Sequence, residues 1–250
     1  MKEWYKIKGQ HLKNIANKMR GYLGTTDAIA PEEMDAKVDE VYNKRWHEQW
    51  DKMQQNGNRV NYTYAFGGHT WDDENFKPKY DMNPTDALGM FIVCQIRDLR
   101  KSAIGVDIDF SKSKRLTNIF SYAATKYVGV ISTIGSTSSD LSGMFGNSGI
   151  VSIDEFILKS DGSQSLTNIF QSCPNLEHVI VSGVIGKNGF NVSASPKLDL
   201  ESLLSILNAL ADKSGDTSGT SWVCTLGTDN LAKLSDEQKQ IATDKGWNLV

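Results

Sequence analysis

The first side chains that could do chemistry are His69 and the three consecutive acids Asp72, Asp73 and Glu74. Carboxylates beside an imidazole can bind a metal ion or transfer protons. Adjacent carboxylates in a strand or turn point in different directions, however, and the sequence shows no second cluster of ligands. We therefore interpret the segment as a solvated acidic turn. We predict no catalytic residue, no metal site and no cofactor.

Two further segments carry groups that could bind ligands. Asp107 and Asp109 alternate in a predicted strand, but a calcium loop needs an Asp-x-Asp-x-Asp-Gly run that the chain lacks. The glycines of 183–186 are not followed by the Lys-Ser/Thr pair of a phosphate-binding loop. Neither a calcium site nor a nucleotide site is predicted.

The three cysteines, Cys94, Cys173 and Cys224, lie far apart and form no Cys-x-x-Cys motif. Zinc-binding and dithiol redox sites are therefore unsupported. Cys94 and Cys173 occupy the same position of a repeated phrase, where other copies have Ala123 and Ser148. We interpret both thiols as small buried side chains.

Composition excludes several classes of partner. The net charge is −3 and the sequence pI is about 5.8, so there is no basic surface for nucleic acid. A hydrophobic fraction of 39% and a charged fraction of 23% are typical of a globular chain. No apolar run is long enough to cross a membrane, and residues 1–8 lack the apolar core of a signal peptide. We expect no membrane insertion and no export by the general secretory route.

One short sequence phrase recurs along the chain. The structure that its copies form must position any functional site. Residues 87–91, 116–120, 141–145 and 166–170 share an apolar residue, two variable residues, Met or Ile, and Phe. The phrase recurs every 25 to 29 residues, and a small residue follows each Phe at the third position. Self-similarity at this period is typical of a solenoid, which displays a surface and seldom does chemistry.

The clearest unit continues into a strand pattern. Leu176, Val179 and Val181 have the spacing of inward repeat residues, and Ile153, Phe156 and Leu158 repeat it in the preceding unit. The residues between them are predicted to lie outside, where a ligand would bind. Our candidate ligand-facing residues are Glu155, Glu177, His178, Ile180 and Ser182.

The chain before the repeats lacks the repeated phrase and shows other patterns. Apolar periodicity predicts helices over 10–23 and 31–55, and the alternation of 58–66 predicts a β-strand. The aromatic stretch 69–84 is interpreted as a cap on the first repeat. We predict that one apolar face of the helices attaches or oligomerises the protein through Leu12, Ile15, Met19, Met34, Val38 and Val41.

The chain after the repeats reads as a closing cap. We predict a helix over 199–210 with Asp199 as its N-cap, a strand over 222–226, and a last helix from Ser235 to Ala242. The expected division is 1–57 for the attachment segment, 58–84 for connector and cap, 85–183 for the repeats, and 184–250 for the C-terminal repeat and cap.

The Phe-x-x-Cys-x-x-Leu-x-x-Val-x-Val run of 170–181 resembles BspA-like leucine-rich repeats, and 231–247 looks like the closing segment of many such proteins. The resemblance covers about 85–250. It implies an α/β fold: a short leucine-rich-repeat-type solenoid with a parallel β-sheet and helical turns, here preceded by an N-terminal helical segment.

The N-terminal part carries a second resemblance. Residues 12–16, 24–27, 29–34 and 38–41 are similar to a segment recurrent in tail-fibre and baseplate-associated proteins of phages and prophages of gut-type Gram-positive bacteria. Residues 56–66 and 71–80 resemble the connector between that segment and such repeats. The resemblance implies a virion tail component that contacts the host surface. Such proteins are usually symmetric oligomers, often trimers by family analogy, and the sequence alone does not fix the number of copies.

We therefore expect a non-enzymatic phage tail or baseplate protein whose repeats bind the host. Its expected partners are other tail or baseplate proteins, further copies of itself, and a host cell-surface glycan or protein. A bacterial cell-surface or secreted leucine-rich-repeat adhesin is the alternative. A polysaccharide-degrading tail enzyme is a weaker one. The expected location is the virion tail, or the extracellular space or bacterial surface under the first alternative.

Overall fold

The chain divides into two compact units, Met1–Asn58 and Arg59–Val250. The computed structural model describes residues 17, 18, 20, 62–68, 76, 78 and 81–250. In the first unit, residues 17, 18 and 20 are helical. The rest of both predicted N-terminal helices lies outside the described residues, as do all the predicted attachment residues: Leu12, Ile15, Met19, Met34, Val38 and Val41.

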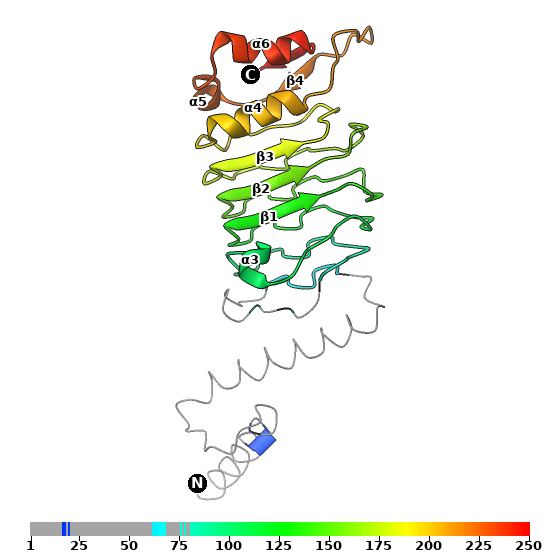
Figure 1. Cartoon of the computed structure of the whole chain (residues 1–250), viewed down its shortest axis with the longest axis vertical. Helices are drawn as coiled ribbons and strands as arrows, with labels where there is room; N and C mark the ends of the chain where they lie inside the picture. Colours follow the sequence, from blue (N-terminus) through cyan, green and yellow to red (C-terminus); the bar gives the residue numbers. More distant parts are fainter. Residues whose placement is uncertain (1–16, 19, 21–61, 69–75, 77, 79–80) are drawn as a thin grey trace, which may run out of the picture. The chain divides into compact units, whose positions relative to one another are not determined.

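The second unit is a mixed α/β fold with a parallel sheet (Figure 1). The sheet has the order β1-β2-β3, formed by Tyr127–Ser132, Ser152–Ile157 and His178–Ser182. A second parallel pair joins β4 (Trp222–Cys224) to β5 (Trp247–Leu249). The described helices of this unit are α3 (Lys101–Ile104), α4 (Leu200–Ala209), α5 (Thr228–Leu231) and α6 (Asp236–Asp244). None of the helices in the described part of the chain has the length and apolarity needed to cross a membrane.

Each repeated phrase, together with the two residues after its Phe, forms a pair of tight turns, which we call a turn unit. Successive turn units stack on one another. The rings of Phe91, Phe120, Phe145 and Phe170 lie nearly parallel, with centroids 5.2 to 5.5 Å apart. Backbone N–H groups join each phrase to the next, as from Phe91 to the carbonyl of Ile119 at 2.8 Å. The residues shared by the phrases are buried, so the apolar positions of the repeat form a continuous core.

The same stack contains a copy of the phrase that the sequence did not reveal. The strand predicted over 58–66 is wrong for 62–66, because residues 63–68 are turns. Tyr62 and Phe66 are buried at the first and last positions of the phrase, and the Phe66 ring stacks on Phe91 at 4.8 Å. With Tyr and Ala65 in place of Leu and Met, the segment alternates like a strand, but the stacked neighbour decides its conformation.

Two positions of every turn unit have a left-handed backbone. They are the third residue of the phrase and the second residue after Phe. Glycine and asparagine, which adopt this conformation readily, fill most of them. Tyr64, Val93 and Tyr122 adopt it at φ 53°, 57° and 56°. These three residues store local strain, Val93 most of all because it is β-branched.

The sheet forms the other side of the stack. Val128, Ile153 and Val179 share one register and are buried. The Phe156 ring from β2 meets the Phe145 ring from a turn unit at 5.9 Å, edge to face. The predicted inward positions of 153–158 and 176–181 are all buried and are thus confirmed. Side chains that point outward from strands and from turns therefore lie on opposite sides of one core.

The C-terminal cap largely follows its sequence signals. The α4 helix begins after Asp199, whose Oδ1 accepts a hydrogen bond from the Ser202 amide at 2.8 Å, as predicted. The α6 helix has Ser235 as its N-cap, in a capping box with Gln238. The β5 strand was not predicted. Its three residues form a strand because they pair with β4.

Candidate functional site: the two outward faces of the repeats

Two surfaces are candidates for function, and we name them by their elements. The strand face comprises the outward residues of β1, β2 and β3. It includes Asp154, Glu155, His178, Ile180 and Ser182. The turn face comprises four positions of each turn unit: the second, third, sixth and seventh residues counted from the start of the phrase. Of these residues, Gly89, Ser121 and Gly146 are buried and the others are half-buried or exposed.

The structure joins two of the predicted ligand-facing residues directly. The Ser182 hydroxyl donates a hydrogen bond to Glu155 Oε1 at 2.9 Å across β2 and β3. Ile180 is half-buried beside them. Glu177, which precedes β3, is exposed and its Oε1 lies 3.9 Å from Lys197 Nζ. The predicted residues therefore share one side of the stack. Whether they bind a ligand stays a prediction.

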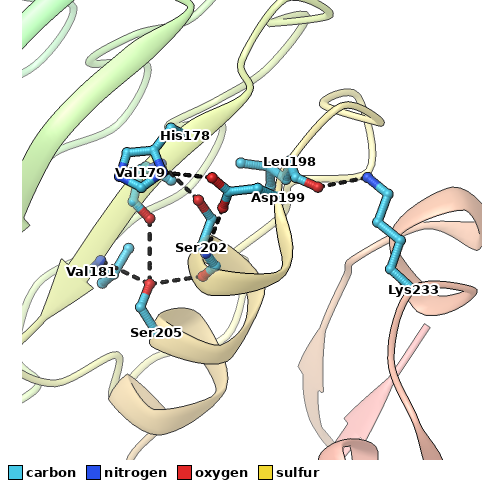
Figure 2. A network of polar contacts seen from close by, with 8 residues as sticks. All are labelled: His178, Val179, Val181, Leu198, Asp199, Ser202, Ser205 and Lys233. Atoms are coloured by element: carbon cyan, nitrogen blue, oxygen red, sulfur yellow. Dashed lines mark hydrogen bonds and ion pairs between the residues drawn. The ribbon is translucent and has the colours of Figure 1, made fainter.

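His178 belongs to a polar network where β3 meets α4 (Figure 2). Its Nδ1 lies 2.7 Å from Asp199 Oδ2. Burial alone would raise the pKa of Asp199, but hydrogen bonds from Ser202 and His178 hold the pKa of this carboxyl below its usual value. The negative carboxylate is thus favoured at the helix N-terminus, where it complements the helix dipole. One ring nitrogen of His178 is engaged inside the protein.

The edge of the sheet is sealed by two serines of α4. The Val179 amide donates to Ser202 Oγ at 2.9 Å, and the Val181 amide donates to Ser205 Oγ at 3.0 Å. Figure 2 shows both hydroxyls directed from the helix to β3. An open strand edge would expose a row of unpaired donors. Here α4 takes the place of a further strand, so the β3 edge is closed to strand addition.

A hollow of about 370 Å³ lies between α3 and β1 at the other end of the sheet. Its lining includes the apolar residues Leu99, Phe110 and Phe120 and the charged residues Lys101 and Asp154. The neighbouring Arg100 guanidinium lies 4.7 Å from the centre of the Tyr127 ring and pairs with Asp98 at 2.5 Å. Arg100 and Asp98 therefore largely neutralise each other at this end of the sheet.

The turn face has no such charges. None of its outward positions, in any of the five described units, is Asp, Glu, Lys, Arg or His, although 23% of the chain is charged. Their residues are Thr63, Tyr64, Gly67, Gly68, Leu88, Gly89, Ile92, Val93, Thr117, Asn118, Ser121, Tyr122, Ser142, Gly143, Gly146, Asn147, Thr167, Asn168, Gln171 and Ser172.

Charged side chains appear just outside this face, at the residue before three of the five phrases. Asp86 and Arg115 occupy that position and pair with each other at 2.5 Å. Asp140 occupies it in the next unit and accepts a hydrogen bond from the Ser142 amide at 2.9 Å. The border charges are thus engaged in local contacts, and the face between them is neutral.

Two tyrosine rings stand out on the turn face. Tyr64 and Tyr122 are 55% and 62% exposed, more than the intermediate burial that is typical of tyrosine. The Tyr64 ring lies against the backbone of Gly89, where a Cβ atom would come within 2.5 Å of Tyr64 Cε1. Asn118 lies over Gly143 in the same way. Bulky and glycine residues therefore alternate along this column, and glycine makes room for its neighbour.

The cysteines are internal and His69 lies outside the described residues, whereas Asp107 is exposed and pairs with Lys101. Cys94 and Cys173 are buried as predicted. Burial raises the pKa of the Cys173 thiol, and it raises that of Cys224 to about 12, which disfavours the reactive thiolate. Among the described residues, no three His, Cys, Asp or Glu side chains gather as metal ligands do. His69 and residues 72–74 are not among the described residues.

Comparisons with protein-family models, with curated proteins and with solved structures find no match to this chain.

Proposed function

We propose that this chain is a non-enzymatic binding protein, a phage tail or baseplate component whose repeats contact the host cell surface. We further propose that its repeats form a short solenoid of the leucine-rich-repeat type. The proposal rests on the two resemblances carried by 12–80 and 170–247 and on the arrangement of the repeat residues.

The observation that carries the binding role is the separation of constant from variable positions. Residues that the phrases share are buried in one core, whereas the positions that vary between units lie on the strand face or the turn face. A scaffold of this kind keeps its fold while its surface changes, which suits recognition of a variable partner. The polar residues of the strand face and the neutral residues of the turn face are both open to a ligand.

The test has two parts, each with the full-length protein. Purified particles released by lysis are analysed by mass spectrometry and by gold-labelled antibodies, and labelled protein is incubated with Gram-positive gut bacteria. We expect the protein at the tail and on the cells. Its presence on the producing cell's surface and absence from particles would favour the adhesin. Shortening of wall polysaccharide after incubation would favour the enzyme.

A further inference from the structure

The left-handed backbone of the turn face does not fully explain why this face has no charged residues. Its third and seventh positions are left-handed, which favours Gly and Asn. Its second and sixth positions are not left-handed, although Ser121 and Gly146 at the sixth position are buried. Yet these also hold only neutral residues, such as Thr117, Ser142 and Gln171. The backbone therefore explains half of the pattern at most.

The close stacking of the turn units does not explain the absence of charged residues either. Units about 5 Å apart would disfavour like charges at the same position of neighbouring units, but opposite charges would attract. The strand face has a similar spacing and keeps Asp154, Glu155 and His178. Opposite charges could therefore alternate at the second positions of the turn face, none of which is buried. A neutral ligand accounts for their absence, because each unneeded charge would have to be desolvated.

The chemistry of the face points to one class of neutral ligand. We propose that the turn face binds a neutral glycan, with Tyr64 and Tyr122 as stacking platforms and the exposed carboxamides of Asn118, Asn147 and Asn168 as hydrogen-bond partners of sugar hydroxyls. This inference rests on the proposed host-binding function and names its surface and ligand class. A tyrosine ring offers an apolar face and a polar tip, and a carboxamide both donates and accepts.

Two features of the geometry support the platforms. The Cδ1–Cε1 edge of the Tyr64 ring lies over Gly89, which fixes the ring there, while more than half of the side chain stays exposed. Tyr64 and Tyr122 stand at left-handed positions where Asn or Gly would be less strained, so the rings are kept at the expense of stability. The rise between units is also close to the length of one sugar residue in an extended chain, so successive units can meet successive sugars.

A protein partner fits this face less well. Cores of protein–protein interfaces are enriched in Trp, Met and Arg besides Tyr. The turn face has none of those three in its described positions, and its C-terminal half consists of small polar residues. Neutral glycan is therefore the occupant to test, and capture of a protein ligand by this face would count against the proposal.

The direct test is calorimetric titration of the full-length protein with cellohexaose, chitohexaose, maltohexaose and the neutral fraction of Gram-positive wall polysaccharide, with hyaluronan oligosaccharide as the charged comparison. The substitutions are Tyr64→Asn and Tyr122→Asn, which install the residue of corresponding units. The matched control is Val130→Asn on the strand face, where Val130 is 56% exposed. Thermal unfolding of each variant checks the fold.

We expect at least one neutral glycan to bind, and each tyrosine substitution to weaken it roughly tenfold while the unfolding temperature is kept or raised. Val130→Asn should leave the affinity unchanged. Binding of hyaluronan alone, no binding of any neutral glycan, or equal affinity in all three variants would overturn the assignment.

A cell-binding assay with the same variants separates this inference from the function on which it rests. If wild-type protein labels the cells and both tyrosine variants label them equally well, the glycan-binding turn face is wrong and the binding function stands. If even wild-type protein fails to label cells, the host-binding function itself is wrong.

Discussion

The strand face and the turn face are two sides of the same repeats, but they differ in charge and in backbone strain. Charged residues on the strand face have partners nearby: Ser182 for Glu155 and Asp199 for His178. The turn face has no charge, and it holds three bulky side chains in left-handed conformation. The core between them is shared, so neither difference reflects the packing beneath.

This contrast separates what the scaffold requires from what a surface selects. Extended strand residues tolerate most side chains, and charges there are stabilised by cross-strand neighbours. Left-handed turn positions tolerate few side chains, so a tyrosine or valine at such a position is unfavourable for stability. A residue that weakens the fold and remains exposed is a better functional candidate than one that the fold itself stabilises.

The largest predicted effect comes from a substitution in the core that both faces share. Phe145 contacts Phe120, Phe170 and Phe156, so Phe145→Ala should lower the free energy of unfolding by about 3–5 kcal/mol. Urea unfolding measures the loss. Hydrogen exchange at Phe120 and Val179, one amide from each side, should report the same transition. If only one side is destabilised, the two faces do not depend on a single core.

The next effect is confined to the edge of the strand face. Ser202→Ala removes the acceptor of the buried Val179 amide and should cost about 1–3 kcal/mol, with faster hydrogen exchange at Val179. Asn208→Ala on the exposed side of α4 is the matched control and should be neutral or slightly stabilising. Equal stabilities for the two variants would show that the serine does not seal the sheet.

A smaller effect of opposite sign is expected on the turn face. Val93→Asn relieves a β-branched residue at φ 57° and should raise the free energy of unfolding by about 0.5–1 kcal/mol. The same change at Val130, which is similarly exposed but extended, should be neutral or slightly destabilising because Asn disfavours strands. Chemical denaturation measures both. A destabilised Val93→Asn would remove strain as a distinction between the faces.

Much of the fold could be predicted because the buried positions of the repeat recur at regular spacing in the sequence. The buried inward positions within 153–158 and 176–181 and the N-cap at Asp199 follow from spacing and from side-chain chemistry alone. The unit at 62–66 and strand β5 could not be predicted in this way. The first alternates like a strand and the second has three residues, so both take their conformation from a neighbour distant in sequence.

The candidate surfaces were less accessible to prediction. Spacing placed Glu155 and Ser182 outside the core, but their hydrogen bond depends on a register shift in β2 between Ile153 and Phe156 that spacing does not reveal. The neutrality of the turn face is present in the sequence. It becomes visible only once the structure shows which variable positions of the phrase point outward.

The smallest predicted effect is the response of glycan binding to salt. Because the turn face has no charged residue, the affinity for a neutral glycan should change less than about twofold between roughly 0.05 M and 0.5 M sodium chloride. Calorimetric titration at both salt concentrations measures this. A charged ligand held by Lys101 in the hollow beside β1, or by Asp154 on the strand face, would respond strongly, because screening weakens exposed charge pairs. A marked salt dependence would bring the border residues Asp86 and Arg115, or the strand face, into the binding site, and the two faces would no longer differ in function as they do in charge.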